Sequence, residues 1–153
     1  MTLEHHEAVR ATVMAVAHHI DAKRWDALRA LYASEVETDY TSLFGGTPQR
    51  QSGDALIAGW RSALANVATQ HLLGPIDVRV TGAVARAVTH VRALHHVAGA
   101  PGGAYWEVLG HYVFDLALSD ANTSAWQISG MTLETIMQTG NPNLLAEASA
   151  GSV

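Results

Sequence analysis

The chain has 153 residues, of which 48% are hydrophobic, a length and composition that suit one compact domain with a sizeable core. Its nine Lys and Arg are scattered and outnumbered by fourteen Asp and Glu, which argues against a nucleic-acid partner. No apolar run approaches the roughly 20 residues that span a bilayer, no basic leader opens the chain, and the absence of cysteine excludes disulfides and thiolate chemistry. We therefore expect a cytoplasmic protein that forms one domain over residues 1–153.

The first part of the chain is predicted to be mostly helical. Apolar residues recur at helical spacing from Val9 to Ile20, and Ser52-Gly53-Asp54 offers a plausible capping residue ahead of a second such pattern. In chain order we expect helices over residues 9–20 and 24–32, a strand over 34–43, a Gly- and Pro-rich loop at 45–48, and a helix over 55–67.

The rest of the chain is predicted to be strands joined by short turns. The expected strands cover residues 69–73, 76–81, 84–97, 105–118 and 125–134. Because hairpin-length connections cannot build a parallel sheet, helices followed by such strands indicate an α+β fold with an antiparallel sheet. The core should extend over residues 9–137, with a small-residue tail over 138–153.

Asp21 and His71 form the candidate catalytic pair. Taken singly, Asp21 can be explained as a turn residue and His71 as a core histidine. A buried imidazole becomes a useful general base when a second group, usually an aspartate, fixes its tautomer and stabilises its charged form. The pair therefore predicts acid–base chemistry if the fold brings the two side chains together.

His95 is predicted to point into the interior of the domain. Side chains alternate between the two faces of a strand, so the residues that precede His95 by even steps share its face. That face is small and mostly apolar, as a cavity wall would be, and consists of Ala93, Val91, Thr89 and Ala87. His96 should point outward.

Three segments of the chain resemble the scytalone dehydratase family: DAKRWDAL at 21–28, TDYTS at 38–42 and TQH at 69–71. That family belongs to the SnoaL-like group of nuclear-transport-factor-2-like folds, which also includes polyketide cyclases, dehydrochlorinases and steroid isomerases. The resemblance implies a curved antiparallel sheet whose N-terminal helices close a cone around an apolar pocket. It further implies that Asp21 orients His71, that Tyr40 binds a water or a carbonyl oxygen, and that His95 is a second pocket histidine.

The chain departs from the family pattern at three pocket positions. The family's second water-binding tyrosine falls at Ile20, and the polar residues of a later strand fall at Phe114 and Leu116. A more apolar pocket indicates a different substrate. The residues expected to contact it are Ile20, Trp60, Tyr112, Phe114 and Leu116.

Two classes of function fit these residues. The first is a cofactor-free enzyme acting on a small apolar or polyketide-like carbonyl compound by elimination, isomerisation or cyclisation. The second is a small-ligand-binding or protein-interaction module, which fold alone does not distinguish from an enzyme. The presence of Asp21, Tyr40, His71 and His95 in one chain favours the enzyme, because a carrier needs no base with its own orienting carboxylate.

No metal site and no cofactor are expected, because the histidines form no close His-x-His or His-x-x-x-His pair. A homo-oligomer, dimer or trimer, is expected on the outer face of the sheet. The outward-facing residues of one strand there combine apolar and polar side chains, a composition that suits an interface better than full exposure to solvent: Val88, His90, Arg92 and Leu94.

Overall fold

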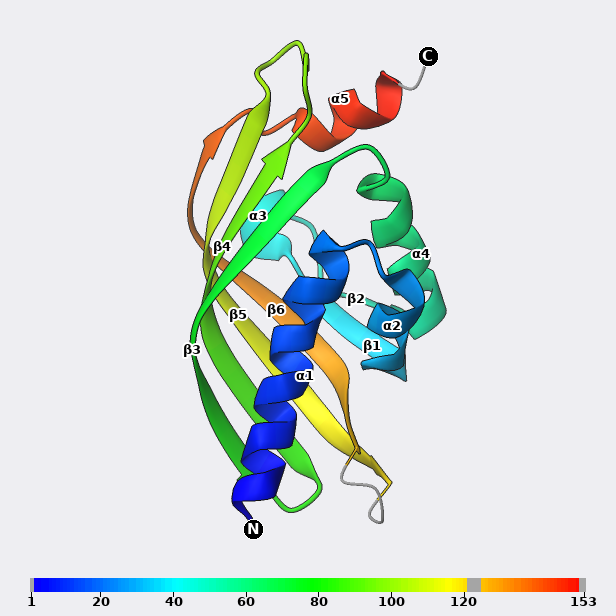
Figure 1. The fold of residues 1–153 in the computed structure, drawn as a ribbon, viewed down its shortest axis with the longest axis vertical. Coiled ribbons are helices and arrows are strands. Elements are labelled where there is room, and N and C mark those ends of the chain that lie inside the picture. Colours follow the sequence, from blue (N-terminus) through cyan, green and yellow to red (C-terminus); the bar gives the residue numbers. More distant parts are fainter. Residues whose placement is uncertain (1, 121–124, 152–153) are drawn as a thin grey trace.

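A computed structural model describes residues 2–120 and 125–151 of the chain. Three helices lie within the curve of a strongly bent sheet (Figure 1): α1 (Leu3–Asp21), α2 (Trp25–Ala30) and α4 (Gly53–Ala63). The C-terminal helix α5 (Leu144–Ala150) stands at one end of the sheet, and the one-turn helix α3 (Thr41–Phe44) lies nearer the middle of the molecule. None of the helices in the described ranges is both long and apolar enough to cross a membrane.

The sheet has six strands in the order β2-β1-β6-β5-β4-β3. The strands are β1 (Tyr32–Asp39), β2 (Gln49–Ser52), β3 (Ala68–Thr81), β4 (Val84–His96), β5 (Tyr105–Asp120) and β6 (Ala125–Gly140). Strands β3 to β6 form an antiparallel meander, whereas β1 runs parallel to β6. A parallel neighbour is possible here because the whole meander separates these two strands in sequence. The α+β fold with its curved, mostly antiparallel sheet is therefore confirmed.

Helix α1 packs against the concave face of the sheet through one apolar stripe. Its buried residues, Val9, Val13, Val16, Ala17 and Ile20, recur at helical spacing and are at most 8% exposed. The predicted helix is confirmed, although it begins at Leu3 and not near Val9. Because Asp21 ends this helix, the packing of the stripe fixes where its carboxylate lies.

The strand predicted over residues 34–43 ends earlier than expected. Strand β1 begins at Tyr32 and ends at Asp39, whose Oδ1 accepts hydrogen bonds from the Thr41 amide (2.9 Å) and the Thr41 hydroxyl (2.6 Å). An aspartate that bonds the backbone two residues later starts a turn. As a result, Tyr40 leaves the sheet at the start of α3 and is free to face the interior.

Strand β3 is one continuous strand, where the sequence indicated two. Its pairing with β4 is irregular only between Leu73 and Ile76, around Gly74 and Pro75. Proline lacks a backbone donor and is tolerated at the edge of a sheet, the position that β3 occupies. Strand β2 pairs with β1 in a segment where no strand was predicted.

Residues 144–150 of the expected C-terminal tail form the helix α5, which the sequence did not predict. Leu144 and Ala148 of this helix are buried. Glu147 accepts hydrogen bonds at Oε2 from the Asn141 side chain (2.8 Å) and from the Gly102 amide (3.2 Å) in the β4–β5 connection. These contacts hold α5 against the end of the sheet.

Candidate active site

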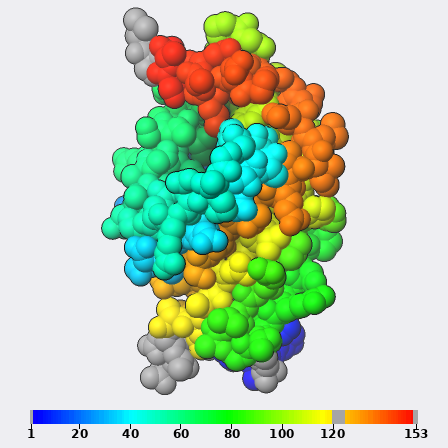
Figure 2. All heavy atoms as spheres, turned by 180° about the vertical axis from the view of Figure 1, so that it is seen from behind, coloured from blue at the N-terminus to red at the C-terminus, as the bar shows by residue number. Residues whose placement is uncertain are grey.

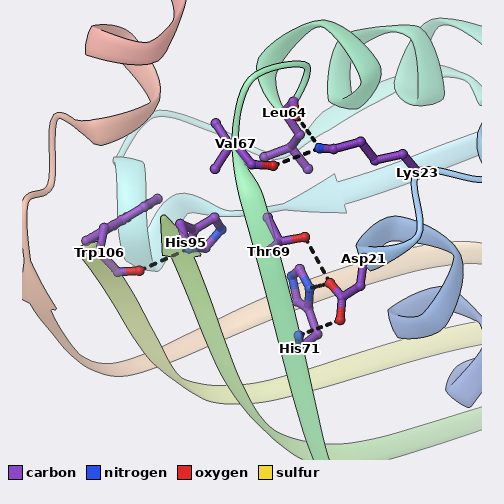
Figure 3. A network of polar contacts seen from close by, with 8 residues as sticks. All are labelled: Asp21, Lys23, Leu64, Val67, Thr69, His71, His95 and Trp106. Atoms are coloured by element: carbon purple, nitrogen blue, oxygen red, sulfur yellow. Dashed lines mark hydrogen bonds and ion pairs between the residues drawn. The ribbon is translucent and has the colours of Figure 1, made fainter. Parts of the chain in front are cut away.

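Asp21 and His71 are in direct contact, as the sequence predicted. Asp21 Oδ1 lies 2.7 Å from His71 Nδ1, and Asp21 Oδ2 accepts the His71 backbone amide at 2.8 Å (Figure 3). The Thr69 hydroxyl donates to Oδ1 at 2.9 Å. Because a carboxylate only accepts, Nδ1 of His71 carries a hydrogen, and in the uncharged ring Nε2 is then the nitrogen with the lone pair.

Three donors keep the Asp21 carboxylate charged. Burial pulls the pKa of Asp21 upward, but the hydrogen bonds from the His71 ring, the His71 amide and Thr69 outweigh it, so the pKa lies below its usual value. The Asp21 side chain is 24% exposed and that of His71 only 8%. The pair therefore places a fixed negative charge, the Asp21 carboxylate, next to the nearly buried imidazole of His71.

His95 lies beside His71 on the neighbouring strand. Its ring meets that of His71 edge to face, with centroids 6.0 Å apart, and its Nδ1 lies 3.2 Å from the Trp106 carbonyl oxygen (Figure 3). Burial, with the nearby His71, lowers the pKa of His95 to about 4. His95 is therefore uncharged at neutral pH, and the residues that share its face on β4 are buried, as strand parity predicted.

Lys23 anchors the connection that leads from α4 into β3. Its Nζ donates to the carbonyl oxygens of Leu64 (2.5 Å) and Val67 (2.7 Å), as Figure 3 shows. Its backbone has a φ of 55°, which is uncommon for a residue other than glycine. Burial lowers the pKa of Lys23, and the Asp21 charge opposes that change. Lys23 thus fixes the start of the strand that carries Thr69 and His71.

Two tyrosines face the histidines. The Tyr40 hydroxyl lies 3.7 Å from the sulfur of Met131, a weak acceptor, and Tyr112 is 7% exposed on β5. Burial raises the pKa of both hydroxyls, so both stay protonated at neutral pH. Each can donate a hydrogen bond to a ligand oxygen.

These side chains surround a cavity of about 260 Å³. A neighbouring space of about 60 Å³ shares Tyr40, His71, His95 and Tyr112 with it. The surface is hollowed between α3, α4 and the C-terminal segment (Figure 2). The main cavity is lined by Ile20, Tyr40, Phe44, Trp60, Ala63, Leu64, His71, His95, Tyr112 and Leu145.

Two of the expected substrate contacts lie outside the main cavity. Leu116 is 2% exposed and pairs in register with Ile128 in the core beneath α1. Phe114 lines a space of only about 10 Å³ with Val13 and Val16. Both positions lie farther along β5 than Tyr112, where α1 fills the concave face of the sheet. The remaining candidates, Ile20, Trp60 and Tyr112, do line the cavity.

The chain matches the model of one protein family. A model of the SnoaL-like domain matches residues 1–132. The chain belongs to the SnoaL-like domain family. No curated protein matches this SnoaL-like chain.

Solved structures share the SnoaL-like fold at low sequence identity. The Kfla4162 protein of Kribbella flavida is 23% identical, with a TM-score of 0.83 over 92% of this chain and 96% of that one. A candidate scytalone dehydratase of Novosphingobium aromaticivorans is 20% identical, with a TM-score of 0.75 over 90% and 88% of the two chains. A type 2 hexachlorocyclohexane dehydrochlorinase is 11% identical, with a TM-score of 0.74 over 90% and 89%.

Sequence reasoning missed several residues around the SnoaL-like cavity. Phe44 and Leu145 line it from α3 and α5, two helices that were not predicted. Lys23 stood in the matched segment, but nothing in the sequence indicated that its ammonium reaches two carbonyls more than 40 positions away. Among the described residues, no three His, Asp or Glu side chains gather closely enough to hold one metal ion.

Proposed function

We propose that this chain is a cofactor-free lyase or isomerase that moves a proton next to the carbonyl group of a small, largely apolar compound. The observation that carries the proposal is the Asp21–His71 pair, whose ring lines the main cavity. A base that operates near neutral pH needs a lone pair aimed at the substrate and a partner for the charge it acquires.

His71 acts as the general base in this proposal. Its Nε2 takes a proton from the carbon next to the carbonyl, and the resulting imidazolium is stabilised by the Asp21 carboxylate. The same proton can then return to another carbon in an isomerisation, or to a departing oxygen in a dehydration. Asp21 holds the ring in place and stays charged throughout.

Tyr40 and Tyr112 stabilise the negative charge that develops on the carbonyl oxygen. Tyr40 gives up only a weak contact with the Met131 sulfur when it turns to a ligand. Two of the solved structures that share the fold carry the names of eliminating enzymes, a dehydratase and a dehydrochlorinase, which agrees with a lyase. The substrate's apolar body would lie against Ile20, Trp60 and Leu145.

The test is hydrogen exchange at carbon. Cyclic ketones with one or two rings, such as 2-tetralone, are incubated with the protein in D2O, and loss of the proton signal next to the carbonyl is followed by NMR. We expect exchange well above the buffer rate for ketones that bind. Binding without any exchange across the series would contradict the proposal and favour a ligand-binding module.

We also propose that copies of the chain associate through the outer face of the sheet. His90 and Arg92 are exposed there, as predicted, beside a groove of about 350 Å³ on the same face. Large apolar side chains line that groove while remaining more than half exposed: Leu72, Ile136 and Met137. Light scattering at micromolar concentration should give a dimer or trimer, and Met137→Glu should shift the mass toward a monomer. A monomer mass for the unaltered chain would contradict this expectation.

A further inference from the structure

We infer that the cavity selects an uncharged, mostly apolar ligand that carries a hydroxyl or N–H group, and that Nε2 of His95 accepts the hydrogen bond from that group. The inference names a substrate class for the enzyme proposed above and rests on that proposal in this respect. It assigns His95 to ligand recognition and leaves proton transfer to His71.

The tautomer of His95 follows from its neighbour on β5. The Trp106 carbonyl oxygen can only accept, so the nitrogen 3.2 Å from it, Nδ1, must donate. In an uncharged imidazole the other nitrogen is then an acceptor. Burial, which lowers the pKa of His95 to about 4, keeps the ring in this form at neutral pH.

Nε2 of His95 is available to a ligand. His95 lines both the main cavity and the space behind it. Within the described residues, the His95 ring forms its side-chain hydrogen bond through Nδ1, and no N–H or O–H group donates to Nε2. A ligand that supplies a donor to this nitrogen gains a hydrogen bond, and so affinity, over a matched ligand that does not.

Both histidines of the cavity therefore present Nε2 as a hydrogen-bond acceptor, but they have different roles. His71 offers Nε2 because Asp21 holds its Nδ1 hydrogen, and His95 offers Nε2 because Trp106 holds its own. Their ring centroids are 6.0 Å apart, so two groups of one small molecule can reach both. A substrate can thus present an acidic C–H to His71 and a polar hydrogen to His95.

Charge selection follows from the side chains around the cavity. Neither Lys nor Arg is among the residues that line it, so an anion would lose its hydration without gaining a counter-ion. A cation would also lose its hydration without gaining a free counter-ion, because the Asp21 carboxylate already accepts three hydrogen bonds. Apolar side chains line most of the cavity, which suits a neutral ring compound.

The test uses three matched probes, 2-naphthol, 2-methoxynaphthalene and 2-naphthoate, titrated calorimetrically at pH 7. The unaltered protein should bind 2-naphthol about 5- to 10-fold more tightly than 2-methoxynaphthalene, the range that one neutral hydrogen bond supplies, and should bind 2-naphthoate most weakly. His95→Leu should remove the preference for 2-naphthol. His96→Leu, which removes an imidazole from the same strand but from its outer face, should retain it.

A second measurement needs no variant. The ¹⁵N chemical shifts of His95 in the unaltered protein should show a hydrogen on Nδ1 and a lone pair on Nε2, and 2-naphthol should shift the Nε2 signal. A hydrogen on Nε2, equal affinity for the two neutral probes, preference for 2-naphthoate, or a preference that survives in His95→Leu would each overturn the inference.

The outcomes also separate this inference from the proposed function. The probe affinities require no turnover, and the ketone exchange assay requires no donor on the ligand. Loss of exchange in His71→Gln with an unchanged naphthol preference in His95→Leu overturns the inference alone. The reverse pattern overturns the proposed function and leaves the ligand class standing.

Discussion

Replacing His71 with glutamine should lower turnover by roughly 10²- to 10⁴-fold, the contribution of a general base, while ligand affinity stays nearly unchanged. Glutamine has a similar volume, and its amide can still donate to Asp21. It has no nitrogen that accepts a proton near neutral pH. The exchange assay and naphthol titration, run on the same preparation, measure the two effects separately.

His96→Gln is the matched control for this variant. It introduces the same substitution on β4 at a histidine that packs against Tyr105 on the other side of the sheet, with ring centroids 4.7 Å apart. Its exchange rate should equal that of the unaltered protein. A His71→Gln variant that is fully active on a compound it binds would contradict the assignment of His71 as the base and move that role to another residue, such as His95.

The elements that carry Asp21 and His71 were predictable from local signals, whereas the contact between the two residues was not. The apolar stripe that ends at Ile20 fixes the end of α1, and the alternating pattern of β4 fixes which side of the sheet is interior. The resemblance supplied the pairing between the two elements. Strand parity also indicated, independently of the resemblance, that His95 faces the interior.

The walls of the cavity were less predictable, because they depend on contacts between distant segments. Leu145 reaches the cavity from α5, which is held in place in part by the hydrogen bond from Gly102 to the Glu147 carboxylate, 45 positions away. Phe114 and Leu116 stand where the resemblance places polar pocket residues, and both were expected to contact the substrate. Helix α1 covers that part of β5 instead. Tyr40 faces inward because a turn made by Asp39 ends β1. Such a turn spans too few residues to appear in the periodicity of the sequence.

Replacing Asp21 with asparagine should also lower turnover by orders of magnitude, through the tautomer of His71. The Asp21 carboxylate accepts from three donors, two at Oδ1 and one at Oδ2. Asparagine offers one oxygen, so its amide NH2 must face either the His71 backbone amide or the His71 ring. In the second arrangement Nδ1 becomes the acceptor and Nε2 carries the hydrogen, which removes the lone pair from the cavity.

The pH dependence of stability provides a readout independent of activity. The pKa of Asp21 in the folded chain lies below the ordinary value of 3.8, so its charge stabilises the fold fully above that value. This contribution is lost as the pH falls through the lower folded pKa. The melting temperature of Asp21→Asn should therefore lie below that of the unaltered protein at neutral pH, and the difference should shrink below about pH 3.8. A difference that does not change with pH would contradict the hydrogen bonding assigned to the carboxylate.

The double variant, Asp21→Asn with His71→Gln, tests whether the two residues act as one unit. Once glutamine replaces the base, no imidazolium forms, so the carboxylate has no charge left to stabilise. The double variant should therefore exchange ketone protons only slightly more slowly than the poorer single variant. The opposite outcome is that the losses of transition-state stabilisation in the two single variants add up in the double variant. Asp21 would then act on the reaction by a route other than His71, for example by holding Thr69 and the start of β3 in place.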